Sequence, residues 1–306
     1  MQITTNFNKL NIPSNTTVAI GSFDGVHLAH QAIINKLLHL SKTHNLIPYV
    51  FFFEPLPKEF FMKDKAPSRI YDFRNKVINI IDSGVDNIIC QKFNQEFANI
   101  EAETFIENYL VKKLKVKHII VGDDFKFGKN REGDCDLLKK LSSKYGYTVD
   151  ILSTLLAGDN RISSSRIRKA IADNDIDKAT DLLGKPLKVN SRIIHGQKNG
   201  RKIGFHTANQ KLLKNSVLKG VYLTKTYIDN KTYYGITNAG TRPTIDGKNK
   251  LLETHIFDFN EYIYSKHITV EILDFIRPEK KFDSFDELKN QIELDIKTAK
   301  KQISSL

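Results

Sequence analysis

The sequence predicts an α/β domain with a doubly wound, Rossmann-like parallel sheet, followed by a small antiparallel β-barrel domain with a terminal helix. Residues 18–183 alternate short apolar strands with amphipathic helices, which is typical of a parallel sheet covered on both faces. Residues 190–275 hold short segments rich in β-branched and aromatic residues without intervening helices, which favours a barrel. Residues 284–303 repeat apolar positions at helical spacing.

The length of 306 residues is typical of two domains, each able to bury its own core. We place the boundary near residue 186, because Gly184 and Pro186 are stop signals at the end of a helical segment. The predicted domains are therefore residues 1–186 and 187–306.

The composition narrows the class of protein. Cys90 and Cys135 lie far apart without a C-x-x-C pattern, which argues against a disulfide framework or a zinc site. No apolar run approaches the ~18 residues of a membrane span, and the first residues lack a signal-peptide pattern, so we expect a cytoplasmic protein. The net charge of +12 suits polyanions, but the lysines are scattered, so nucleotides are the expected partners rather than nucleic acid.

The first domain is predicted to begin with a strand at 18–20, a turn at Gly21–Gly25 and a helix at 26–40. Further elements follow in alternation: strands at 47–53, 87–90, 118–121 and 148–152, helices at 71–82, 101–114 and 136–144, and a short helix from Ser164. Residues 173–183 are predicted as a polar helical connector. Ligands of such sheets bind at the carboxyl ends of the strands, near a topological switch point.

The strand, turn and helix at 18–40 predict a phosphate site. A helix N-terminus offers backbone N–H groups and about half a positive charge. His27 and His30 are three residues apart in the first turn, where two imidazoles can hold phosphoryl oxygens and stabilise developing charge. The alternative is a partly exposed helix whose histidines have no catalytic role; the glycine turn after a strand favours the phosphate site.

Residues 23–31, Phe-Asp-Gly-Val-His-Leu-Ala-His-Gln, resemble the nucleotidyltransferases with an H-x-G-H signature. The resemblance is greatest to the adenylyltransferase half of the bacterial bifunctional riboflavin kinase/FAD synthetases. It implies that His27 and His30 are catalytic and that ATP binds at Gly21, Phe23, Asp24 and Gly25. Three positions depart from the family: Ala29 replaces a glycine and crowds the nucleotide, while Phe52 and Leu56 replace a threonine and a histidine.

Two later segments resemble the same family. Residues 121–128 match V-G-x-D-F-x-F-G, which implies close backbone approach at Gly122 and a ribose- or loop-orienting role for Asp124; a packed aromatic turn is the alternative. Residues 161–168 match I-S-S-T-x-I-R, which implies that triphosphate oxygens bind Ser163, Ser164, Ser165 and Arg168. Ser163 as a helix N-cap is compatible with that role.

The second domain is predicted to contain strands at 190–194, 220–228, 231–238, 251–257 and 267–275, with a hairpin turn at Asp229-Asn230. Ser284 and Glu287 form a capping box at the start of the last helix. Its apolar stripe is interpreted as packing and comprises Leu288, Ile292, Ile296, Ala299 and Ile303.

Three stretches of this domain resemble riboflavin kinases. Residues 196–209 match G-x-x-x-G-R-x-L-G-F-P-T-A-N, which implies that Gly200, Arg201 and Gly204 contact ATP phosphates. Thr207 and Asn209 would hold Mg²⁺ through neutral oxygens, and His206 replaces a proline that would stiffen the loop.

The second stretch, residues 237–244, matches N-x-G-x-R-P-T and implies flavin contacts at Asn238 and Arg242. The third contains Glu253, which aligns with the family's general base on the ribityl 5′-hydroxyl. Arg277 matches an arginine that closes over the flavin. A glutamate on a strand is ordinarily a solvated surface residue, but three motifs in the family order favour catalysis.

The resemblance implies a bifunctional enzyme that phosphorylates riboflavin to FMN with ATP and Mg²⁺. It would then transfer AMP from ATP to FMN, giving FAD and pyrophosphate. Two alternatives stay open: a riboflavin kinase whose adenylyltransferase domain is degenerate, and a non-catalytic flavin-sensing protein that binds RNA. The sequence carries no signal for an oligomeric state.

Overall fold

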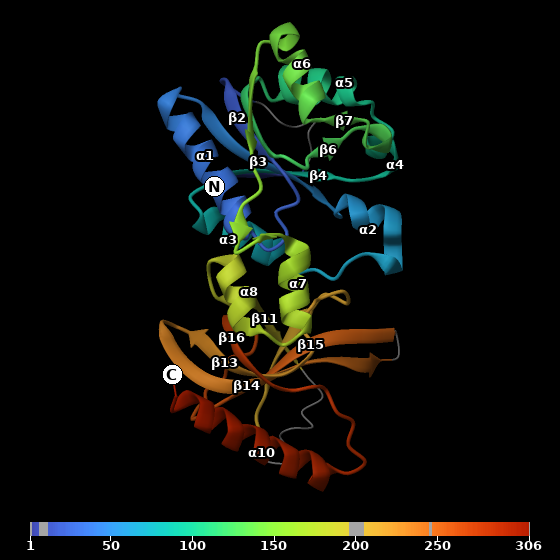
Figure 1. Cartoon of the computed structure of the whole chain (residues 1–306). Coiled ribbons are helices and arrows are strands. Elements are labelled where there is room, and N and C mark those ends of the chain that lie inside the picture. Colours follow the sequence, from blue (N-terminus) through green and yellow to red (C-terminus); the bar gives the residue numbers. More distant parts are fainter. Residues whose placement is uncertain (1, 6–11, 196–204, 245–246, 306) are drawn as a thin grey trace. The chain divides into compact units, whose positions relative to one another are not determined.

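The computed structural model describes residues 2–5, 12–195, 205–244 and 247–305, and for residues 242–244 and 247–249 it describes the backbone only (Figure 1). The chain divides into two compact units. The sheet unit comprises residues 1–67 and 76–163, and the barrel unit comprises residues 68–75 and 164–306. Each unit is described below by itself.

The sheet unit is built on a parallel sheet in the order β1-β4-β3-β2-β5-β8. This confirms the predicted parallel sheet. After β2 the chain adds β3 on one side and later β5 on the other, so the topological switch point lies between β2 and β5. The strands are β1 (Gln2–Thr4), β2 (Thr16–Ile20), β3 (Ile47–Glu54), β4 (Asn87–Lys92), β5 (Val116–Gly122) and β8 (Thr148–Leu152).

Helices lie against this sheet, with α1 packed on β2, β3 and β5, and α6 packed on β8. The segment predicted as one helix at 101–114 is instead a short α5 followed by a π-helical stretch, η3. The helices are α1 (Leu28–Thr43), α2 (Pro57–Met62), α3 (Phe73–Asp82), α4 (Gln95–Ala98), α5 (Ala102–Thr104), η3 (Phe105–Lys113) and α6 (Cys135–Tyr145), with 3₁₀ turns η2 (Lys63–Lys65) and η4 (Lys129–Arg131). Short hairpin strands complete the unit: β6 (Lys126–Phe127), β7 (Gly133–Asp134), β9 (Leu156–Ala157) and β10 (Asn160–Arg161).

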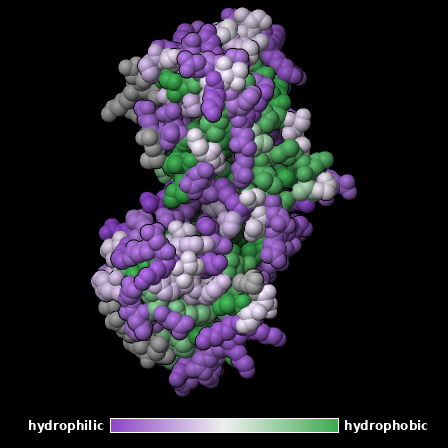
Figure 2. All heavy atoms as spheres, turned by 90° about the vertical axis from the view of Figure 1, so that its left-hand side faces the viewer, coloured by the Kyte–Doolittle hydropathy of each residue, from purple (hydrophilic) through white to green (hydrophobic). Residues whose placement is uncertain are grey.

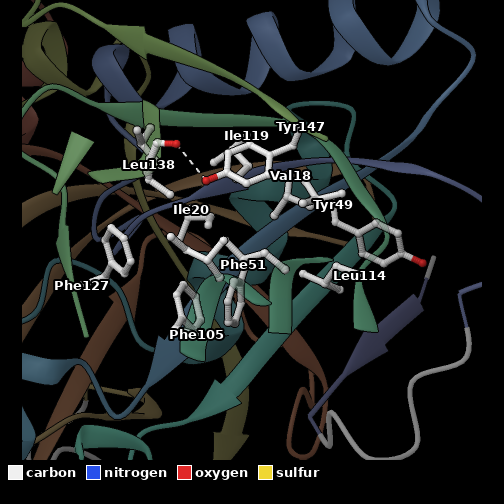
Figure 3. Packing of buried hydrophobic residues seen from close by; sticks show 14 of the residues in the cluster. Val18, Ile20, Tyr49, Phe51, Phe105, Leu114, Ile119, Phe127, Leu138 and Tyr147 are labelled. Atoms are coloured by element: carbon white, nitrogen blue, oxygen red, sulfur yellow. Dashed lines mark hydrogen bonds between the residues drawn. The ribbon is translucent and has the colours of Figure 1, made fainter. Parts of the chain in front are cut away.

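The core of the sheet unit holds β2 in place. Every residue of β2 is buried, and Val18 and Ile20 pack with Phe51 and Ile119 from the neighbouring strands (Figure 3). The Tyr147 hydroxyl, on the same cluster, donates a 2.8 Å hydrogen bond to the Leu138 carbonyl. The carboxyl end of β2, where the predicted phosphate turn begins, is therefore anchored by rigid packing.

The barrel unit is a closed antiparallel barrel in the order β11-β12-β15-β14-β13-β16, as predicted. Its interior includes Thr224, Thr237 and Thr254, which are fully buried and joined by hydroxyl hydrogen bonds of 2.8 and 3.0 Å. The predicted strand set lacked β12, because its sequence Ala-Asn-Gln-Lys-Leu has no β-branched or aromatic residue. The strands are β11 (Leu187–Ile194), β12 (Ala208–Leu212), β13 (Gly220–Ile228), β14 (Lys231–Thr244), β15 (Gly247–Ile256) and β16 (His267–Arg277).

The hairpin turn between β13 and β14 is confirmed, since Asp229 and Asn230 have φ of 47° and 64°. The predicted C-terminal helix is α10 (Phe285–Ile303), whose N-cap Ser284 accepts a hydrogen bond from the Glu287 N–H (3.1 Å). Ala299 is fully buried in its contact with the barrel, as the predicted stripe requires, and Figure 1 shows α10 beside β13 and β14. Helices α7 (Ser164–Ala172) and α8 (Ile176–Leu183) also group with the barrel unit, which therefore begins before residue 186 in this division by contacts. The functional domain boundary at residue 186 stays a prediction.

Residues 68–75, which end within the first turn of α3, belong to the barrel unit although the sheet unit surrounds them in the sequence. The Arg69 N–H donates to Asn215 O (2.7 Å), and the Val217 N–H donates to Arg69 O (2.9 Å). The Asn190 N–H donates to Asn75 Oδ1 (2.7 Å). A segment from early in the sequence is therefore a structural part of the barrel unit.

Across the described ranges, no helix combines the length and apolarity that crossing a bilayer requires. Figure 2 shows hydrophilic side chains over much of the visible face of each unit.

Candidate active sites

The turn after β2 has a strained backbone. Phe23, Gly25 and Val26 have φ of 48°, 89° and 42°, and a β-branched residue such as Val26 rarely adopts this region. Phe23 and Val26 are fully buried, and the Gln31 side chain donates to Val26 O (2.9 Å), which fixes the turn. Strain of this kind persists where the surroundings enforce it and clusters at functional sites.

The two predicted catalytic histidines lie together at the start of α1. His27 is the N-cap residue and is 5% exposed, while His30 occupies the first turn. Their rings stack with centroids 3.8 Å apart and planes 22° apart, and the Phe23 ring lies 5.1 Å from that of His30. Asp24, in the same turn, is 1% exposed. Two imidazoles therefore lie at the positive end of a helix dipole, as a phosphate site requires.

The end of β5 lies at the same edge of the sheet, because β2 and β5 are parallel neighbours across the switch point. A Cβ on Gly122 would come 3.3 Å from Asp124 Oδ1, so this turn is tightly folded. Asp124 Oδ2 pairs with Arg161 Nη2 at 2.7 Å, which favours the loop-orienting role among the two predicted for it. Gly21, at the end of β2, donates its N–H to Phe51 O (3.2 Å).

Asp123 was missed by sequence reasoning. Its carboxylate accepts hydrogen bonds from the N–H (2.7 Å) and hydroxyl (2.8 Å) of Thr154. Burial alone would raise the pKa of Asp123, but these bonds and the Arg161 charge outweigh it and lower the pKa. Asp123 thereby ties β5 to the segment that leads to Ser163.

The serine-arginine segment is divided between the units: Ser163 ends a segment of the sheet unit, whereas Ser164, Ser165 and Arg168 lie in the barrel unit. On α7, Arg168 Nη1 lies 3.4 Å from Ser165 Oγ, so the guanidinium and one hydroxyl are neighbours. The cooperation of Arg168 with His27 stays a prediction.

The two family departures at and just after the end of β3, Phe52 and Leu56, are packing positions. Phe52 is fully buried, and the Lys76 ammonium lies 4.6 Å from the centre of its ring and 3.9 Å from Glu54 Oε2. Leu56 is 9% exposed and caps α2, with its N–H bound to the Glu59 carboxylate (3.0 Å). Lys76 is a fully buried cation that sequence reasoning missed; its position on the same helical face as Val77 and Ile80 was the available signal.

In the barrel unit, strand register brings four predicted residues into one row. Asn209 on β12 lies opposite Glu253 on β15, and Glu253 lies opposite Asn238 on β14. Asn238 lies opposite Val221 on β13, which in turn lies opposite Arg277 on β16. Residues directly opposite in antiparallel strands share a face and lie about 5 Å apart, so these side chains form a continuous line.

The row lies on the outer face of the barrel, because Val221 packs with Ala299 of α10 while Thr254 and Thr237 fill the interior. Glu253 is half-buried in this row. Arg277 forms a two-pronged ion pair with the buried Asp295 of α10, with Nε–Oδ1 and Nη2–Oδ2 distances of 2.8 Å. Its Nη1 donates to Pro278 O (2.9 Å), so Arg277 fastens α10 beside the row.

Asn209 has the features of a cation ligand. It is 4% exposed, and its Oδ1 has no hydrogen-bond partner in the part of the chain that the structure describes. Asn209 and Thr207 line a cavity of about 360 Å³, together with Ile193, His206, Phe259, Tyr262 and Tyr264. A buried, unpaired amide oxygen at a cavity suits a hard divalent cation, so these residues fit the predicted metal site.

The metal would need phosphate oxygens as further ligands, since the described residues contain no cluster of three His, Cys, Asp or Glu side chains able to hold one.

His206 is held in place although it replaces a proline, because His255 Nδ1 lies 2.9 Å from the His206 carbonyl oxygen. Burial lowers the pKa of His255, which favours the neutral ring. Gly200, Arg201 and Gly204 lie outside the described residues, as does the Arg242 side chain.

Comparison with known proteins agrees with this geometry. The FAD synthetase family model matches residues 9–166, and the riboflavin kinase family model matches residues 183–303. The bifunctional riboflavin kinase/FMN adenylyltransferase of Haemophilus influenzae is 44% identical over 285 residues, covering 92% of each chain. The chain belongs to this family. The Escherichia coli (strain K12) member is 42% identical over 285 residues, covering 92% of this chain and 91% of its own.

Membership of the bifunctional riboflavin kinase/FMN adenylyltransferase family confirms the resemblance that the sequence motifs indicated. The strained turn and its histidines fall within the FAD synthetase match, and the barrel row falls within the riboflavin kinase match. A crystal structure described as a macrolide-efflux protein from Streptococcus pneumoniae is 30% identical, with a TM-score of 0.81 and 98% coverage of both chains.

Proposed function

We propose that the chain phosphorylates riboflavin to FMN in the barrel unit and adenylylates FMN to FAD in the sheet unit, in the cytoplasm, with ATP and Mg²⁺. One observation carries the kinase assignment: Glu253 stands in register between Asn209 and Asn238, so a carboxylate lies beside the amide that we propose as a metal ligand.

In the kinase reaction, Glu253 accepts the proton of the ribityl 5′-hydroxyl as that oxygen attacks the γ-phosphorus in line, and ADP leaves as the bond to the bridging oxygen breaks. Thr207 and Asn209 would hold Mg²⁺, which when bound neutralises phosphate charge. The triphosphate occupies the cavity beside them. The phosphate contacts expected at Gly200, Arg201 and Gly204 stay predictions from the sequence. The flavin extends along the row from Glu253 past Asn238, toward the end that Arg277 and α10 border. The flavin contact expected at Arg242 stays a prediction from the sequence.

In the adenylyl transfer, the FMN phosphate is already an anionic nucleophile, so no protein base is needed. It attacks the α-phosphorus of ATP, and pyrophosphate leaves. His27 and His30 donate hydrogen bonds to the phosphoryl oxygens, whose charge grows in the transition state, and the α1 N-terminus adds its dipole. ATP lies over Gly21–Gly25 and Gly122. The triphosphate contacts expected at Ser163, Ser164, Ser165 and Arg168 stay predictions from the sequence.

The test is one incubation of the chain with riboflavin, ATP and Mg²⁺, with flavins separated by chromatography over time. We expect FMN first and FAD later, and neither product when EDTA removes the metal. FMN without FAD would favour the kinase-only alternative that Ala29, Phe52 and Leu56 suggest. Flavin binding without ATP consumption would favour the flavin-sensing alternative.

A further inference from the structure

The cavity beside Thr207 and Asn209 has an aromatic rim that belongs to none of the motifs above. The segment between β15 and β16 contributes Phe259, Tyr262 and Tyr264 to it. The Tyr264 ring stacks on His195, with centroids 4.3 Å apart and planes 21° apart. The Tyr262 ring follows, 5.0 Å from Tyr264 and tilted by 56°. Three rings therefore run in series from the end of β11 to the mouth of the cavity.

Tyr262 is the exposed member of this series. Its side chain is 76% exposed, more than Phe61 at 62% and Phe285 at 52%. An aromatic ring at the mouth of a cavity, supported on one edge by a second ring, offers an open π-face to a planar ligand. Its six-membered ring also distinguishes Tyr262 from the other two side chains here: Ile193 is aliphatic and 3% exposed, and His206 offers a smaller imidazole ring.

Two chemically different groups of side chains line the cavity. Asn209 and Thr207 supply the oxygens suited to a metal ion and to phosphates, whereas Phe259, Tyr262 and Tyr264 supply aromatic surface. A nucleotide whose phosphates lie at the polar residues has its base among the rings. Nucleobases stack on aromatic side chains without needing a specific hydrogen-bond pattern.

We propose that Tyr262 stacks on the adenine of the ATP used by the kinase and covers it from solvent. The proposal rests on the proposed kinase function. Tyr262 acts on nucleotide binding alone, because the reacting atoms lie at Glu253 and at the metal. The sheet unit has its own ATP site, so its adenylyl transfer is independent of Tyr262.

The experiment compares Tyr262→Ala, Tyr262→Phe and a matched control, Phe285→Ala, an exposed aromatic outside the site. In Tyr262→Ala we expect the kinase KM for ATP to rise about tenfold, the low end for base stacking. kcat stays within about twofold and the KM for riboflavin is unchanged. Tyr262→Phe keeps the wild-type values because it retains the ring. FAD formation from supplied FMN is unchanged in all three.

An unchanged KM for ATP in Tyr262→Ala would overturn the proposal, as would an equal rise in Phe285→Ala or a loss in Tyr262→Phe. A wild-type chain that makes no FMN would instead refute the proposed kinase function. The stacking is then still tested by calorimetric titration of MgADP into the His27→Ala/His30→Ala chain, which isolates the barrel site. Tyr262→Ala weakens that binding about tenfold if the proposal holds, and leaves it unchanged if the proposal is wrong.

Discussion

The two candidate sites are built in different ways. In the sheet unit, the turn from Gly21 to His30 is ten consecutive residues, positioned by a buried strand, positive φ angles and a helix start. In the barrel unit, Asn209, Glu253, Asn238 and Arg277 come from four strands and meet only through register. A site of the first kind depends on local backbone geometry. A site of the second kind depends on barrel closure and on the helix fastened over it.

Because the two sites share no residue, we predict that substitutions in one site remove its activity and leave the other activity intact. The largest effect is expected for Glu253→Gln, which keeps the shape but cannot accept the proton. FMN formation falls about 10²- to 10⁴-fold, measured with riboflavin and ATP. FAD formation from supplied FMN stays at the wild-type rate, and the exposed Glu293→Gln on α10 is the control. A fully active kinase would remove Glu253 from the proposed role.

The reciprocal change is His27→Ala/His30→Ala in the sheet unit. We expect adenylyl transfer to fall about 10²- to 10³-fold, because the phosphoryl charge loses its donors. Kinase activity persists, and His39→Ala, an exposed histidine on the same helix, leaves both rates unchanged. Near-native FAD formation in the double variant would refute the role of the stacked imidazoles.

The dependence of the barrel row on α10 is tested by Asp295→Ala. This change leaves the partly buried Arg277 without its buried partner, and breaking such a pair costs about 3 kcal/mol. We expect a lower melting temperature and a higher KM for riboflavin, with adenylyl transfer intact below the transition. Glu293→Ala, on the same helix, should change neither value. An unchanged KM for riboflavin would show that riboflavin binding at the row does not depend on the Arg277–Asp295 ion pair.

The smallest effect concerns Lys250 inside the barrel unit. Burial, with the nearby Lys219 charge, lowers the pKa of Lys250 to about 8, and its ammonium donates to Ser216 O (2.7 Å). Between pH 8 and 10.5 the unfolded chain binds more protons than the folded one, so stability rises with pH in that window.

Against Lys250→Met, the wild-type chain should therefore gain on the order of 1–2 kcal/mol between pH 7.5 and 9.5. Denaturant unfolding of both proteins at the two pH values measures this gain. If the difference in free energy of unfolding between wild type and Lys250→Met is the same at both pH values, Lys250 has an ordinary pKa in the folded protein.

The architecture was predictable where the periodicity is strong. The apolar strands beside α1 and the hairpin at Asp229-Asn230 were identified because their patterns are local. β12 was missed because its polar residues are held by neighbouring strands rather than by propensity. The membership of residues 68–75 in the barrel unit depends on long-range backbone hydrogen bonds that no local pattern encodes.

In the candidate sites, too, local patterns were predictable from the sequence, whereas arrangements that depend on long-range contacts were not. His27 and His30 were paired from spacing alone, and the structure stacks their rings. Glu253 and Asn209 are 44 positions apart in the chain, so only the strand register could place them side by side. The buried charge of Lys76 and the aromatic rim at Tyr262 emerged from packing, which sequence patterns do not specify.

The central claim is that one chain carries two separate ATP sites, one at a helix start and one beside a barrel row. Calorimetric titration with a non-hydrolysable ATP analogue and Mg²⁺ tests it most directly. We predict two equivalents bound per wild-type chain, one in His27→Ala/His30→Ala, and one in Asn209→Ala. A single equivalent in the wild-type chain, or two equivalents retained in either variant, would contradict the account.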